Sequence, residues 1–147
     1  MEEMNTALEP TNEQSGKPAA LRPIGDIIRD LSKELAERHI KIKTLKGQKI
    51  HFITWYHAVK YLDLYAPGWS GEVREVVEIG GRVVVVYRIS IPCLEGFIWR
   101  EATGQESDWD EEEETKYGDP SSNAEAMAFK RAAAKFGLGL YLYDRKK

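Results

Sequence analysis

The spacing of apolar residues changes along the chain from a helical period to a strand period and back, and these changes predict the main elements. Between Ile24 and about His39, apolar residues recur every three or four positions, which is typical of one face of a helix. Lysines then alternate with apolar residues on both sides of Gly47, which predicts a short basic hairpin or an irregular strand pair. Thr54 is a suitable cap for a second helix, expected to run to about Tyr65.

The middle of the chain carries the clearest strand pattern. Glu72–Ile79 and Arg82–Ile91 are rich in β-branched residues, and Gly80-Gly81 between them is the two-residue loop that a type I′ turn requires. The second strand is apolar on both faces near its start, so it is expected to be a central strand covered on both sides, with Pro92 ending it. Phe97–Ala102 supplies a third strand, which completes an antiparallel meander.

An alanine-rich helix is predicted after the meander. Ser122 and Glu125 have the spacing of a capping box, and the helix is expected to end near Phe136 with Gly137 past its end. The order of elements indicates an α+β domain, in which an antiparallel β-meander is followed by a helix to form a β-β-β-α core packed with further helices.

Acidic residues are concentrated in two segments outside this core. Residues 1–19 hold four acidic residues and residues 106–119 hold eight, each against a single lysine. The net charge of the chain is −3, yet the remainder carries 19 basic against 12 acidic residues. Because blocks of like charge form mobile tails and loops, residues 1–20 are expected to be a flexible tail. Residues 103–120 are expected to be an acidic loop within a domain that covers residues 21–147.

Composition limits the location and the class of the protein. No apolar run approaches the roughly 20 residues that a membrane-spanning helix needs, and the acidic start lacks the basic region of a signal peptide. Cys93 is the only cysteine, so the chain cannot form an internal disulfide or a cysteine-based zinc site. A reducing, cytoplasmic location without membrane contact is expected.

Three cations on the last helix are the main candidates for a binding site. Arg131 and Lys135 lie one helical turn apart, and Lys130 projects about 100° round from Arg131. A stripe of fixed cations on a rigid helix suits contact with a phosphate backbone. A solvated helix face with no partner is the alternative. Arg74 and Arg88 on the meander are further candidates for phosphate contacts.

Aromatic residues accompany these cations. Rings that stack on bases, next to a positive groove, are the usual means of binding single strands, although three helices and three strands need most such rings for their core. The candidates are Trp55, Tyr56, Tyr61, Tyr65, Trp69, Tyr87 and Trp99.

The hypothesis that the protein is an enzyme has little support in the sequence. No phosphate-binding loop motif for ATP is present, the three histidines lack metal-site spacing, and neither a cofactor nor a metal is expected. One alternative is a metal-dependent nuclease that uses Asp63 and Glu72, although Arg74 stands where a catalytic lysine would be expected. A second alternative is a scaffold whose acidic loop binds a basic protein partner.

The order of elements together with the terminal segment resembles a known family. Residues 121–144, with Lys130-Arg131 followed by Phe136-Gly137 and Leu142-Tyr143-Asp144, are similar to the closing helix of the DdrA family of DNA-damage-response proteins, which belongs to the Rad52 superfamily of single-strand annealing proteins. Gly68-Trp69-Ser70 before the meander and Arg100–Gly104 at its end also match.

This resemblance implies a β-β-β-α core whose protomers pair side by side into a closed ring. It implies binding of single-stranded DNA in a positive groove and annealing of complementary strands in DNA repair and recombination, without ATP or a required metal, in a nucleoid-associated protein. It also implies that Lys130, Arg131 and Lys135 face the groove, while the acidic run Asp110–Glu114 departs from the better-known members.

Overall fold

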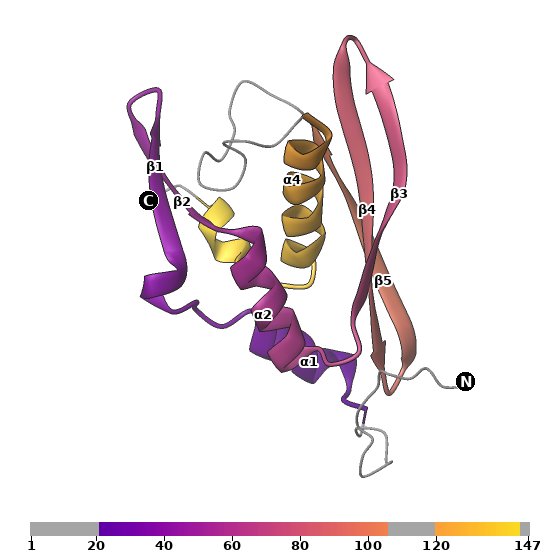
Figure 1. Cartoon of the computed structure of the whole chain (residues 1–147). Helices are drawn as coiled ribbons and strands as arrows, with labels where there is room; N and C mark the ends of the chain where they lie inside the picture. Colours follow the sequence, from indigo (N-terminus) through magenta and orange to yellow (C-terminus); the bar gives the residue numbers. More distant parts are fainter. Residues whose placement is uncertain (1–20, 106–119, 145–147) are drawn as a thin grey trace, which may run out of the picture.

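Helix α4 lies in the middle of the molecule and covers one face of a three-stranded antiparallel sheet (Figure 1). The structure is a computed structural model that describes residues 21–105 and 120–144. Helices α1 and α2 lie near one end of α4. A separate two-stranded hairpin lies on the side of α4 opposite the sheet (Figure 1). The predicted α+β class with an antiparallel meander is confirmed, and the described residues hold three α-helices.

The sheet has the order β3-β4-β5, with β3 at Ser70–Ile79, β4 at Arg82–Cys93 and β5 at Gly96–Gln105. Gly80 and Gly81 adopt φ angles of 58° and 81°, as the type I′ turn between β3 and β4 requires. The central strand is therefore β4, as its apolar run predicts.

Helix α4, Pro120–Ala134, packs on β4 and β5 through small residues. Ala124 and Ala128 are fully buried against Val85, and Gly104 of β5 faces the helix backbone. The other face of α4 and its C-terminal end join the main core. That core includes Ile27 and Leu31 of α1, Leu62 of α2, Ile89 and Ile91 of β4, and Phe136.

The remaining elements precede the sheet. Helix α1 spans Ile24–Leu31, a 3-10 turn η1 spans Glu37–His39, and helix α2 spans Trp55–Tyr65. The hairpin consists of β1, Ile40–Leu45, and β2, Gln48–Ile53, as the alternation of lysines predicts. A second 3-10 turn, η2, spans Leu140–Tyr143 and follows α4.

Four local expectations are wrong. Helix α1 ends at Leu31 and not near His39, because the Ser32 hydroxyl bonds the Ile28 carbonyl at 2.6 Å and the chain then turns. Strand β4 continues through Pro92, which lies beyond the last residue paired with β3, where a missing N–H is tolerated.

The other two expectations concern the acidic segment and the second face of the sheet. Strand β5 extends to Gln105 and α4 starts at Pro120, so the predicted capping residue Ser122 lies inside the helix. The rest of the acidic loop and the N-terminal tail lie outside the described residues. Val84 and Val86 stay half-buried because no described element covers that face of the sheet (Figure 1).

Candidate nucleic-acid interface

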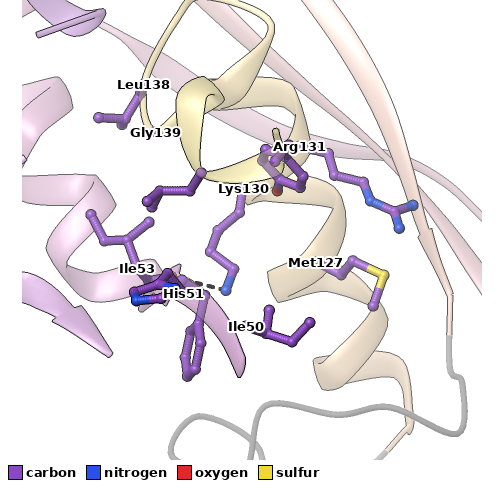
Figure 2. Close-up of a pocket in the computed structure, with 11 residues that line it drawn as sticks. Ile50, His51, Ile53, Met127, Lys130, Arg131, Leu138 and Gly139 are labelled. Atoms are coloured by element: carbon purple, nitrogen blue, oxygen red, sulfur yellow. Dashed lines mark hydrogen bonds between the residues drawn. The ribbon is translucent and has the colours of Figure 1, made fainter. Parts of the chain in front are cut away.

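The C-terminal half of α4 separates two neighbouring pockets. The first has a volume of about 170 Å³ and lies between β2, α4 and the segment that leads into η2 (Figure 2). The second is more open, with a volume of about 330 Å³, and lies between α4, the end of β5 and η2. Arg131 and Tyr143 line both pockets, so the two adjoin each other, and together they are called the α4 cleft below.

Lys130 does not project into solvent as the helical spacing predicts. Its side chain is only 6% exposed, and its ammonium group donates a hydrogen bond of 2.9 Å to the carbonyl of Ile53 at the end of β2 (Figure 2). The same ammonium lies 5.3 Å from the ring centre of Phe52. A cation buried among polar and aromatic partners ties the hairpin to α4 and places positive charge in the floor of the first pocket. A contact between Lys130 and DNA stays a prediction.

Arg131 and Lys135 are exposed and lie along β5, which is an edge strand in the part of the chain that the structure describes. The Arg131 guanidinium donates to the carbonyl of Thr103 at 3.0 Å, and the Lys135 ammonium donates to the carbonyl of Glu101 at 2.7 Å. Both acceptors belong to an edge strand, which carries main-chain groups without a neighbouring strand. These carbonyls are neutral, so the bonds orient the two side chains and leave their positive charges in place.

A further contact fixes the end of α4 on the sheet. Arg100 of β5 donates a hydrogen bond to the carbonyl of Lys135, and its guanidinium carbon lies 4.8 Å from the ring centre of the buried Phe136. Lys135, the residue that follows α4, is therefore linked to β5 in both directions, as a donor to Glu101 and as an acceptor from Arg100.

Arg74 and Arg88 lie elsewhere. The residue opposite Arg88 on β5 is Glu101, whose carboxylate accepts from Arg88 at 2.8 Å and lies 3.8 Å from Arg74. Arg74 also pairs with Glu72 at 2.6 Å. These residues sit on the face of the sheet that α4 does not cover, with as many acids as bases, so the structure does not bring Arg74 and Arg88 to the α4 cleft.

Sequence reasoning missed several residues that line the cleft. They come from three separate elements: His51 from β2, Met127 from α4 and Tyr143 from η2. Met127 precedes Arg131 by one helical turn, which is a visible sequence signal. His51 and Tyr143 carry no such signal, because only the packing of β2 and η2 around α4 brings them together.

The two carboxylates of the nuclease alternative have different partners. Asp63 on α2 accepts a hydrogen bond of 2.7 Å from the indole nitrogen of Trp69, and Glu72 is paired with Arg74. Within residues 21–105 and 120–144, no group of three or more His, Cys, Asp or Glu side chains is arranged to hold a metal ion. No helix in these two ranges has the length and apolar character needed to cross a bilayer.

Comparison with known proteins identifies the class to which this arrangement belongs. Residues 23–147 match the family model described as Rad52/22 family double-strand break repair protein. The chain is 42% identical over 138 residues to the chloroplastic DNA repair RAD52-like protein 2 of Arabidopsis thaliana, covering 91% of this chain and 67% of that protein. It is 40% identical over 124 residues to the mitochondrial DNA repair RAD52-like protein 1 of the same plant, covering 83% and 68%. The chain therefore belongs to the Rad52/22 family of DNA repair proteins.

Proposed function

We propose that this protein binds single-stranded DNA along the α4 cleft and anneals complementary strands, without ATP, during DNA repair and recombination. The observation that carries the proposal is the position of Arg131 and Lys135 at the edge of β5, with Lys130 in the neighbouring pocket between α4 and β2. Cations held one helical turn apart on a rigid element track a phosphate backbone without reading its sequence.

Binding of DNA would give Arg131 and Lys135 stronger hydrogen-bond acceptors than the ones they have in the free protein. The carbonyls of Thr103 and Glu101 are neutral acceptors, whereas a phosphate carries a full negative charge. Charge-assisted hydrogen bonds are roughly twice as strong as neutral ones, so a phosphate competes well for both side chains. Contacts restricted to the backbone leave the base edges available, which annealing requires.

A side-by-side assembly fits the open features of the sheet. Among residues 21–105 and 120–144, strands β3 and β5 are both edge strands, and nothing covers the sheet face that carries Val84, Val86 and the 50% exposed Trp99. Exposed edges and apolar faces are commonly covered by partner subunits. Repeated heterologous contacts close into a ring and join the short clefts into a continuous one. The narrower resemblance to DdrA, the nucleoid-associated cytoplasmic location and a basic partner for the acidic loop stay predictions.

Titration of the protein with oligothymidylate at several salt concentrations tests the binding site. Arg131→Ala and Lys135→Ala should each weaken binding and lower the slope of log affinity against log salt by about 1. Arg29→Ala is the matched control, because Arg29 is an exposed arginine of α1 that pairs with Asp26. Variants at Arg131 and Lys135 that bind like the control would refute the cleft assignment.

Two further measurements test annealing and assembly. The unmodified protein should accelerate pairing of complementary oligonucleotides to the same degree with and without ATP. Light scattering should give a mass of several chains, and a monomer both with and without DNA would exclude the ring.

A further inference from the structure

We infer that a row of aromatic rings at the start of α2 is a second contact surface for single-stranded DNA, on which unpaired bases stack. This inference rests on the proposed function, because it extends the path of a bound strand beyond the α4 cleft. The rings are Trp55, Tyr56, His57, His39 and Tyr61.

The five rings form a continuous series of contacts. Ring centres of His39 and His57 lie 4.4 Å apart with an interplanar angle of 26°, which is a stacked pair. Tyr56 lies 4.9 Å from His57, and Trp55 lies 5.7 Å from Tyr56 in an edge-to-face arrangement. Tyr61 closes the row at 5.5 Å from His39.

Hydrogen bonds fix the inner members of this row. His57 Nδ1 bonds the hydroxyl of the buried Thr54 at 3.0 Å, and His39 Nδ1 bonds the hydroxyl of Tyr61 at 2.8 Å. The Tyr61 hydroxyl also accepts from the backbone N–H of Ala36 at 3.0 Å. The inner rings are therefore ordered before any ligand arrives, and a preordered surface loses little entropy on binding.

The outer members are accessible to a ligand. Trp55 is 43% exposed and Tyr56 is 40% exposed, although most rings of this size are needed in the core of a small domain. Other rings fill that core: Phe129 is buried in it and Tyr87 packs against it, with ring centres 5.4 Å apart. Trp55 and Tyr56 thus present flat apolar surface to solvent at the edge of a rigid stack.

The charge around the row selects the kind of ligand. The pKa of His57 is lowered by burial in the first place and then by His39 and the cations Lys60, Lys41 and Arg38. The pKa of His39 is lowered in the same way, by burial and then by Arg38 and Lys60. Both imidazoles are consequently neutral near pH 7, while the surrounding cations attract phosphates. An apolar stacking surface in a positive field fits a polyanion that carries aromatic bases.

The row and the α4 cleft adjoin each other at the end of β2. Ile53 lines the first pocket of the cleft and accepts the hydrogen bond from Lys130, and Trp55 follows it by two residues. Trp55 therefore lies within two residues of the pocket that Lys130 lines, and the proposed path of the strand continues from the α4 cleft onto Trp55. Bases in a duplex already stack on each other, so this surface favours single strands.

The test compares two oligonucleotides of equal length, an oligothymidylate and an abasic backbone that keeps the phosphates but carries no bases. The unmodified protein should bind oligothymidylate more tightly than the abasic strand. The double variant Trp55→Ala/Tyr56→Ala should bind oligothymidylate about fivefold to tenfold more weakly, since stacking on one ring contributes at least a factor of about five. Its affinity for the abasic strand should be unchanged.

Two controls separate stacking from other effects. Phe97→Ala removes a ring that is 73% exposed on the uncovered sheet face, and it should leave the preference for bases intact. Trp55→Phe retains a ring at the first position and should keep most of the affinity for oligothymidylate.

The outcomes distinguish this inference from the proposed function. If the unmodified protein binds neither strand, the proposed function fails. If it binds both strands equally, or if the double variant retains the preference for bases, DNA binding stands and the stacking surface is refuted. A change of oligomeric mass in the double variant, with its preference for bases retained, would assign the rings to a subunit contact and overturn the inference.

Discussion

Replacing Gly104 with alanine should push helix α4 away from the sheet. A Cβ atom at position 104 would lie 2.3 Å from the carbonyl oxygen of Ala124 and 2.4 Å from the backbone nitrogen of Ala128. Both contacts are with the helix backbone, which has no flexible end that can turn aside. Ordinary van der Waals separation is about 3.4 Å or more, so the helix must move by about 1 Å.

The energetic cost follows from the packing that this movement disturbs. A gap of 0.5–1 Å forfeits about a quarter to a half of each dispersion contact, and overpacking a well-filled core costs typically about 1–3 kcal/mol. The contact is between backbone atoms, so we expect a loss near the upper end, about 3 kcal/mol. For a domain of this size that loss lowers the melting temperature by roughly 6–12 °C.

Gly25→Ala is the matched control for this substitution. Gly25 lies in helix α1, and a Cβ atom there would meet nothing within 4 Å. Alanine at an unobstructed helical position should raise the free energy of unfolding by about 0.5–1 kcal/mol. Urea and thermal denaturation at a fixed protein concentration measure both variants. A Gly104→Ala protein as stable as the unmodified chain would refute the close approach of α4 to β5.

Three other substitutions test the roles of buried and charged groups. Lys130→Met keeps the aliphatic packing but removes the donor to the Ile53 carbonyl, so denaturation should show a loss of about 1.5–3 kcal/mol; unchanged stability would contradict the buried bond. Arg22 beside Asp30 holds the pKa of the Asp30 carboxyl far below its usual range. The stability that this ion pair contributes is therefore present at neutral pH and is lost as the pH falls below about 4. Asp30→Asn should be less stable at pH 7 and lose less on acidification; an identical acid profile would argue against this. Burial lowers the pKa of His57, so this histidine takes up a proton in the unfolded chain before it does so in the folded chain. The free energy of unfolding should therefore fall as the pH drops below about 6.5. His57→Phe should weaken that dependence in melting curves recorded between pH 7.5 and 5.5, and an unaltered curve would exclude His57 as its source.

The sequence alone determines the strands and helices whose patterns are local. The β-branched runs around Gly80-Gly81 specify the β3–β4 hairpin, because a type I′ turn with two glycines leaves little alternative. The alternation of lysines with apolar residues specifies the β1–β2 hairpin, and the alanine-rich segment specifies α4. The ends of elements are less strongly specified, as β4 shows by continuing through Pro92, because they depend on what pairs with the strand.

Tertiary structure decides which of these residues act together. The helical spacing places Lys130 beside Arg131 but says nothing of Ile53, which lies 77 positions earlier and accepts the Lys130 hydrogen bond. Similarly, Arg88 resembles the cations of α4 in sequence, yet Glu101 is its neighbour because β4 and β5 pair in that register. Local periodicity sets which face of an element a side chain takes, whereas burial and partnership depend on elements that are distant in the chain.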